Sequence, residues 1–193
     1  MKLGSLFTGY GGLDQAVADH FSADIAWVAD NDPSACKVIE TRMPGIQNLG
    51  DVTAVDWAAV PAVDIIVGGS PCQDVSLAGR RAGMVDGTRS NLWAAMREAI
   101  AVIQPQIVVW ENVKGALSSA ADSSMEQQPG RVGDSDKGPV LRALGRVLGD
   151  LADLGYDAEW CCIPASAAGA PHRRDRVFVT AWPSIPDASS GRS

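Results

Sequence analysis

The chain has 193 residues, of which 46% are hydrophobic, and this is enough to bury one core but short for two domains. Its net charge of −7 at pH 7 argues against a basic, nucleic-acid-binding surface along the whole chain, although an acidic body can still carry a local basic groove. No apolar run reaches the length of a membrane span and the N-terminus lacks a secretory signal, so we expect a cytoplasmic protein, or one of the host cytoplasm or nucleoid if it comes from a mobile element.

Short apolar and β-branched runs alternate with helix-like segments along the chain. This alternation predicts an α/β fold with a doubly wound, mostly parallel sheet. Helices are expected after Gly12, Pro33, Ser90 and Pro139. Strands are expected at Leu3–Phe7, Ile25–Ala29, Ile65–Val67, Ile107–Trp110 and Arg176–Ala181.

Two segments differ in composition from the rest of the chain. Residues 118–138 are rich in Ser, Gly, Asp and Gln with almost no large apolar side chain, which is typical of a flexible surface loop. Residues 183–193 have the composition of a tail or a truncated linker. We therefore expect one domain over residues 1–182 that contains the loop, followed by the tail.

The cysteines do not indicate a metal site. Cys36, Cys72, Cys161 and Cys162 lack the CxxC or Cys/His spacing of zinc ligands. Adjacent cysteines such as Cys161 and Cys162 are poorly placed to form a disulfide with each other. The sequence thus predicts neither a disulfide framework nor a bound metal.

The stretch "FTGYGGLD" is a Gly-rich turn between the first strand and the first helix. Its Gly9, Gly11 and Gly12 do not have the GxGxxG spacing that cradles a pyrophosphate. Asp30 follows the second strand, where a carboxylate can accept hydrogen bonds from ribose hydroxyls, and Asp51 can accept one from an adenine amino group. Taken singly, each is better explained as an ordinary loop or cap residue. In chain order they outline an adenosine site without a phosphate grip, which fits S-adenosylmethionine better than a dinucleotide.

A thiol stands just past a predicted strand in "DIIVGGSPCQDVSLAGRRAG". Cys72 is either a small buried hydrophobe at a turn or a nucleophile at the carboxyl end of a strand. Glu111, in "VVWENVKG", is expected just past another strand and hence on the same rim. The stretch "GAPHRRDRVFV" places Arg173, Arg174 and Arg176 immediately before the last strand.

These groups suit one kind of chemistry. A thiol, a carboxyl acid and a guanidinium together can add sulfur to an electron-poor ring, protonate one ring atom and hold an oxygen. In isolation Glu111 is equally well a solvated acid, and the arginines a surface cluster.

With these motifs in order, the chain resembles the C5-cytosine methyltransferase family over nearly all of Lys2 to Trp182. The resemblance rests on "LFTGYGGLD", "ADNDP", "GDV", "GGSPCQDVSLAGRRAG", "RSNLW", "ENVKG" and "PHRRDRVFV". It implies a Rossmann-like S-adenosylmethionine-dependent methyltransferase fold, with residues 1–182 as the catalytic domain. It further implies methyl transfer from S-adenosylmethionine to C5 of cytosine in DNA, a role in DNA methylation of the restriction-modification kind, and a flipped cytosine in double-stranded DNA as substrate.

The same resemblance assigns roles to individual positions. Cys72 attacks C6 of the base, Glu111 acts at N3, and Arg176 holds the base with Arg174 alongside. The residues expected to contact the cofactor are Phe7, Gly9, Gly11, Gly12, Leu13, Asp30, Asn31, Asp51, Val52, Pro71 and Leu92. The residues expected to contact DNA are Ser76, Arg80, Arg81 and Arg89.

Some features depart from the family pattern. Ser70 stands where a second proline is frequent, Val75 where Phe is frequent, and His172 where Gln is usual. The target recognition domain and the last motifs of the family do not occur before Ser193, so a second chain or a missing C-terminal half is expected to supply them. Two alternatives remain open, an RNA (tRNA) cytosine-C5 methyltransferase and a non-catalytic subunit or remnant that binds the cofactor.

Overall fold

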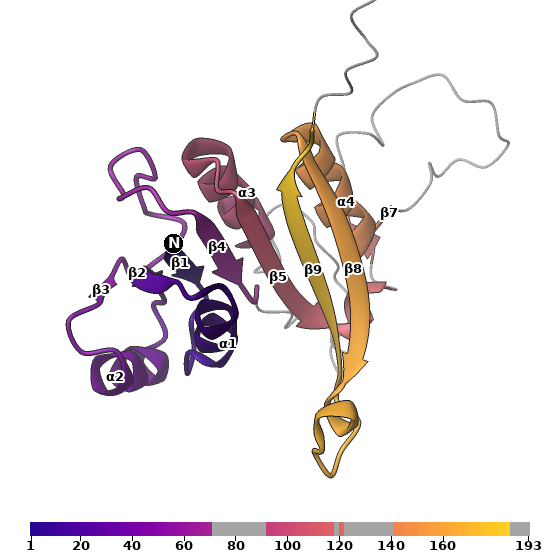
Figure 1. Ribbon diagram of the computed structural model, residues 1–193, viewed down its shortest axis with the longest axis horizontal. Helices are drawn as coiled ribbons and strands as arrows, with labels where there is room; N and C mark the ends of the chain where they lie inside the picture. Colours follow the sequence, from indigo (N-terminus) through magenta and orange to yellow (C-terminus); the bar gives the residue numbers. More distant parts are fainter. Residues whose placement is uncertain (71–91, 118–119, 122–140, 186–193) are drawn as a thin grey trace, which may run out of the picture.

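A seven-stranded sheet in the order β3-β2-β1-β4-β5-β9-β8 runs through the protein (Figure 1). The computed structural model describes residues 1–70, 92–117, 120–121 and 141–185. Neighbours from β3 to β5 pair in parallel, whereas β9 is antiparallel to both β5 and β8. The expected α/β fold with a mostly parallel sheet is confirmed. The strands are β1 (Lys2–Leu6), β2 (Asp24–Ala29), β3 (Gln47–Asn48), β4 (Ile65–Gly68), β5 (Ile107–Val113), β8 (Tyr156–Pro164) and β9 (Asp175–Pro183).

Helices cover both faces of the sheet. The helices are α1 (Gly12–Phe21), α2 (Pro33–Arg42), α3 (Leu92–Ile103) and α4 (Ala143–Asp153). Val17 of α1 belongs to a core cluster with Ile65 and Val67 of β4. Ile66 points to the opposite face, because neighbouring residues of a strand alternate, and packs in a second cluster with side chains from α3 and α4. The sheet is therefore doubly wound, and all four helices begin where the sequence predicts.

Short signals at the carboxyl ends of the strands fix where the helices start. The Oδ1 of Asp32 accepts hydrogen bonds from the backbone N–H groups of Ser34 and Ala35, at 2.8 and 3.0 Å. Pro33 occupies the first turn of α2, where its missing N–H costs nothing. Gly11 precedes α1 with a φ of 81°, a left-handed conformation that favours glycine.

The β8 strand and its pairing with β9 were missing from the sequence-based prediction. The two strands pair from Tyr156 opposite Pro183 to Pro164 opposite Asp175, and the hairpin between them contains a 3-10 turn, η4 (Ala165–Ala168). Strand β8 lies at the edge of the sheet, and its residues from Glu159 to Ile163 are exposed on both faces. A strand without a buried face lacks the alternating pattern by which strands are recognised.

Two further expectations fall largely outside the described residues. Of the predicted loop at 118–138, only Ala120–Ala121 is described, as β6, which pairs with β7 (Leu141–Arg142). The tail at 183–193 is described only as far as residue 185. Within the described ranges, no helix combines the length and apolar character needed to cross a membrane.

Candidate functional site

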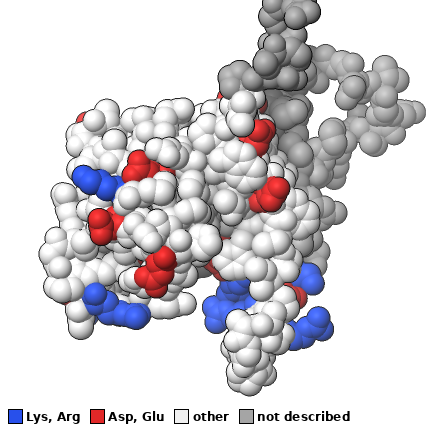
Figure 2. Space-filling model, in the orientation of Figure 1, with Lys and Arg blue, Asp and Glu red and all other residues white. Residues whose placement is uncertain are grey.

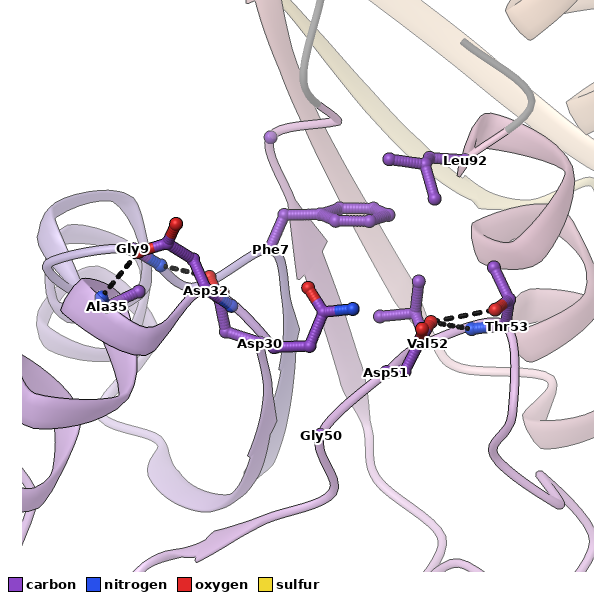
Figure 3. Close-up of a pocket in the computed structure, with 12 residues that line it drawn as sticks. Phe7, Gly9, Asp30, Asp32, Ala35, Gly50, Asp51, Val52, Thr53 and Leu92 are labelled. Atoms are coloured by element: carbon purple, nitrogen blue, oxygen red, sulfur yellow. Dashed lines mark hydrogen bonds between the residues drawn. The ribbon is translucent and has the colours of Figure 1, made fainter. Parts of the chain in front are cut away.

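A cavity of about 630 Å³ opens at the carboxyl ends of β1 and β2 (Figure 3). Open α/β sheets bind their ligands at this edge. The cavity is lined by Phe7, Gly9, Asp30, Asn31, Asp32, Ala35, Gly50, Asp51, Val52, Thr53, Gly69 and Leu92. Seven of these were predicted as cofactor contacts, namely Phe7, Gly9, Asp30, Asn31, Asp51, Val52 and Leu92.

The turn after β1 presents an aromatic ring to the cavity. Phe7 has a φ of 56°, a left-handed conformation that is uncommon for a residue with a side chain and is found mainly where structure around it fixes it. Its backbone N–H donates to the carbonyl of Ala29 at 2.8 Å, which ties the turn to the end of β2. From here the ring points toward Leu92 of α3 (Figure 3). The two side chains form an apolar part of the cavity.

Two carboxylates follow the end of β2. The Oδ2 of Asp30 accepts a hydrogen bond from the backbone N–H of Gly9 at 2.8 Å, and its Oδ1 accepts one from the N–H of Asp32 at 2.9 Å. Asn48 of β3 accepts from the backbone N–H of Asp30 at 3.1 Å. Asp30 is thus fixed between two turns. Asp32 was not predicted as a cavity residue, and its cap contacts with Ser34 and Ala35 show that one carboxylate serves both the start of α2 and the cavity wall.

Asp51 lies across the cavity from these groups. Its Oδ1 accepts hydrogen bonds from the backbone N–H and the hydroxyl of Thr53, at 2.9 and 2.7 Å. These bonds lower the pKa of Asp51 below its ordinary value, so the side chain is ionised at neutral pH. An ionised carboxylate accepts hydrogen bonds only.

The charge of the cavity decides which cofactors fit. Asp30, Asp32 and Asp51 all line it, and no Lys, Arg or His is among its described lining residues. A pyrophosphate would meet three carboxylates without a cation to offset its charge. An adenosine bearing a positively charged group meets hydrogen-bond acceptors and an apolar face instead. The acceptors and apolar side chains of the cavity therefore fit S-adenosylmethionine better than a dinucleotide.

Three residues predicted to contact the cofactor do not line the cavity, namely Gly11, Gly12 and Leu13. A Cβ on Gly11 would lie 2.3 Å from the Met43 Cε, and one on Gly12 would lie 2.4 Å from the Tyr10 ring. The left-handed φ of Gly11 and the Tyr10 ring beside Gly12 favour glycine at these two positions. Their predicted contact with the cofactor stays a prediction.

A second group of side chains lies on β5 and β9. Glu111 accepts from Arg176, whose Nε is 2.6 Å from Oε1. Burial raises the pKa of Glu111, and the charges of Arg176 and Arg174 partly oppose that increase. Glu111 was expected just past the end of a strand, and this was wrong, because β5 continues to Val113 and Glu111 pairs with Phe178 of β9. A strand position holds the carboxyl more firmly than a loop position.

Gly69 connects this group to the cavity. It lines the cavity, and a Cβ added to it would lie 3.0 Å from the Oε2 of Glu111. The backbone leaving β4 therefore passes directly beside the Glu111 carboxyl. The predicted acid and the predicted cofactor pocket are neighbours.

Basic residues gather where β9 begins. His172, Arg173 and Arg174 are exposed, and Arg174 has a φ of 26°. Lys114, in the 3-10 turn η2 (Lys114–Leu117), forms an ion pair of 3.3 Å with Asp175. Figure 2 shows several Lys and Arg side chains around the base of the β8–β9 hairpin. Basic side chains therefore gather locally here, although the net charge of the chain is negative.

Several predicted site residues lie outside the described residues. These are Cys72, Pro71, Ser76, Arg80, Arg81 and Arg89. Their predicted roles in attack on the base, in cofactor contact and in DNA contact stay predictions.

A buried carboxyl lies beneath the turn after β1. Asp14, in the first turn of α1, is 2% exposed, and its Oδ1 accepts a hydrogen bond of 2.7 Å from the hydroxyl of Ser5. Its Oδ2 has no hydrogen-bond partner among the described residues. Burial raises the pKa of Asp14 to about 6, and the nearby charge of Asp30 adds to the increase. Folding therefore favours the protonated form of this group.

Replacing Asp14 by Asn should stabilise the protein above pH 6 but not below pH 4. A carboxyl whose pKa is raised by folding contributes its stability below the unfolded value and loses it as the pH rises through the folded value. At pH 8 we expect Asp14→Asn to increase the free energy of unfolding by about 2 kcal/mol, and at pH 4 to leave it nearly unchanged. Urea denaturation at both pH values measures this. The exposed Asp19→Asn on the same helix is the control, and an equal effect of Asp14→Asn at both pH values would contradict the prediction.

Comparisons with known proteins agree with the motifs. A sequence profile of the C-5 cytosine-specific DNA methylase family matches residues 1–184. The chain is 29% identical to the type II methyltransferase M.NgoBV of Neisseria gonorrhoeae over 98% of this chain and 43% of that protein. It is also 29% identical to the type II methyltransferase M.AquIA of Picosynechococcus sp., over 92% of this chain and 70% of that one.

A solved structure supports the fold. A candidate DNA modification methyltransferase encoded within an Escherichia coli prophage superposes with a TM-score of 0.66 at 21% identity, covering 95% of this chain and 47% of that one. The chain therefore spans less than half the length of this structure and of the Neisseria relative.

Proposed function

The chain belongs to the C-5 cytosine-specific DNA methylase family, and on this premise we propose that it methylates cytosine at C5 in DNA, using S-adenosylmethionine and a covalent bond between Cys72 and C6. One observation carries the proposal beyond family membership. Gly69 both lines the cavity and lies against Glu111, so the cavity and the Glu111 carboxyl are neighbours. A reaction that joins a cofactor to a base needs this adjacency.

The cavity residues have distinct roles in this proposal. Asp30 accepts hydrogen bonds from the ribose hydroxyls, and Asp51 accepts one from the adenine amino group. Phe7, Val52 and Leu92 provide the apolar contact for the adenine. When bound, S-adenosylmethionine supplies a methyl group made electrophilic by its sulfonium.

Cys72 and Glu111 activate the base in this scheme. Cytosine C5 is a poor nucleophile on its own. The Cys72 thiolate forms a bond to C6 while Glu111 donates a proton to N3, and the electron pair of the C5–C6 double bond becomes available at C5. Once C5 carries the methyl group, a base removes the C5 proton, the bond between sulfur and C6 breaks, and N3 returns its proton to the Glu111 carboxylate. The double bond, the free thiolate and the protonated acid are thereby restored. A raised pKa suits Glu111 to this role, because it keeps more of the carboxyl protonated near neutral pH.

Arg176 and the basic residues around it bind the substrate. Arg176 holds the base while pairing with Glu111, and Arg174 lies alongside. The target base lies inside the duplex stack and must be flipped out to reach Cys72. Ser76, Arg80, Arg81 and Arg89 contact the DNA backbone in this proposal, and a second chain or further segment supplies the recognition of sequence.

A trapping assay tests the function. The chain is incubated with S-adenosylmethionine and a DNA duplex containing 5-fluorocytosine, in which fluorine at C5 blocks the last elimination and keeps the protein bonded to the base. We expect a complex that resists denaturation, forms with DNA and not with 5-fluorocytosine RNA, and requires the cofactor. A complex with RNA and none with DNA would show that the substrate is RNA. Cofactor binding by calorimetry without a complex on either polymer, also when the second chain or further segment is supplied, would favour the non-catalytic alternative.

A further inference from the structure

Two side chains from β5 contact the residue Ser70, which follows the end of β4. The Nε1–H of Trp110 donates a hydrogen bond of 3.0 Å to the hydroxyl oxygen of Ser70. The Nδ2 of Asn112 lies 3.3 Å from both the hydroxyl and the carbonyl oxygen of Ser70. Ser70 is 6% exposed and Trp110 is fully buried. The contact joins Ser70, just after β4, to the middle of β5. Ser70 stands two positions before Cys72 in the sequence.

Successive residues of β5 hold this exit from both sides. Side chains of neighbouring strand residues point to opposite faces, so Trp110 and Asn112 share one face and Glu111 occupies the other. Trp110 and Asn112 contact Ser70, while Glu111 lies against Gly69. The position of residues 69 and 70 relative to the Glu111 carboxyl is therefore set by one strand.

Trp110 is itself firmly placed. It lies opposite Gly68 in the pairing of β4 with β5. Its ring contacts that of Trp93 edge to face, with centroids 5.9 Å apart, and the Trp93 indole donates to Asp150 of α4 at 2.7 Å. A buried indole N–H without an acceptor is costly, so Trp110 and Ser70 depend on each other.

We propose that the Trp110–Ser70 hydrogen bond is a positioning contact: it fixes the end of the segment that precedes Cys72 in the sequence and thereby affects the rate of attack on the base. The inference rests on the proposed function. Ser70 is followed by proline in the sequence, which restricts Ser70 to extended backbone, and its hydroxyl and carbonyl contacts with β5 then fix its orientation. Neither side chain belongs to the polar contacts of the cofactor cavity. The contact should therefore affect the covalent step and leave cofactor binding intact.

The test compares Trp110→Phe, Ser70→Ala and the double variant with the unaltered chain. The matched control is Trp27→Phe, because Trp27 is also fully buried and its indole donates to the carbonyl of Pro61 at 3.0 Å, away from this exit. The rate of complex formation on 5-fluorocytosine DNA is measured at saturating cofactor and DNA, together with cofactor affinity and Tm.

We expect Trp110→Phe and Ser70→Ala each to slow complex formation about 10- to 100-fold, with cofactor affinity unchanged within about twofold. Ser70→Ala also removes the contact of Asn112 with the Ser70 hydroxyl. The double variant should be no slower than Ser70→Ala, because that variant already lacks the acceptor of the Trp110 hydrogen bond. Trp27→Phe should lower Tm to a similar degree without slowing the reaction.

Two results would overturn the inference, and they are distinguishable. If the unaltered chain reacts and Trp110→Phe or Ser70→Ala reacts as fast as Trp27→Phe, the positioning role is wrong and the proposed function stands. If the unaltered chain forms no complex even with the second chain or further segment supplied, the proposed function fails and the inference fails with it.

Discussion

Replacing Cys72 by Ser is expected to abolish methyl transfer while leaving cofactor affinity nearly unchanged. The nucleophile must add to C6 and later leave it, and a thiolate does both at neutral pH, whereas a serine hydroxyl is both harder to ionise and a poorer leaving group. We expect the rate to fall by about a thousandfold or more. Transfer of a labelled methyl group to DNA measures the first effect, and calorimetry with S-adenosylhomocysteine measures the second.

The control for this variant is Cys161→Ser. Cys161 is exposed on the edge strand β8, and nothing in the described structure connects it to the cavity. It should retain full activity. Comparable activity in Cys72→Ser and Cys161→Ser would exclude Cys72 as the nucleophile, whereas loss of cofactor binding in Cys72→Ser would indicate a structural role for the thiol.

The sequence predicted those parts of the site that follow directly from strand ends and turns. Phe7, Asp30 and Asp51 come just after short strands or turns, and parallel strands bring such positions to one edge of a sheet. All three line the cavity. The order of helices and strands is enough to place these three residues at one edge of the sheet, because their position does not depend on packing between distant segments.

Contacts between strands distant in sequence were beyond sequence reasoning. The pairing of Glu111 with Arg176 depends on β9 lying antiparallel to β5, a direction that the alternation of helices and strands does not give. The Trp110–Ser70 bond depends on a buried indole meeting a hydroxyl 40 positions away. A tryptophan in an apolar run is equally well explained as core packing, so its N–H gave no signal.

The acidic charge of the chain acquires a local meaning from the structure. Three of its carboxylates line the cavity, and the exposed Arg173 and Arg174 lie just before the start of β9. Like charges on a pocket wall disfavour phosphate groups, so the acidic cavity helps to keep nucleic acid out of the cofactor site. The described structure thus has an acidic cavity at one place and exposed arginines at another, as the proposed function requires.

Replacing Glu111 by Gln is expected to lower the rate of methyl transfer about 100- to 10,000-fold, the range in which a positioned acid contributes to catalysis. Glutamine keeps the shape of the side chain and can still contact Arg176, but it has no acidic proton to donate to N3. Cofactor affinity should be unchanged, because Asp30 and Asp51 provide the polar contacts of the cavity. The exposed Glu98→Gln on α3 is the matched control and should behave like the unaltered chain.

The pH dependence separates proton donation from mere packing. Burial raises the pKa of Glu111, so its protonated fraction, and with it the rate, should fall as the pH rises through that raised value. The Glu111→Gln variant should lack this decline. In Arg174→Gln the decline should move to higher pH, because the charge of Arg174 lowers the pKa of Glu111. Single-turnover rates measured from acidic to alkaline pH test both, and a decline at the same pH in Glu111→Gln as in the unaltered chain would show that a different group supplies the proton.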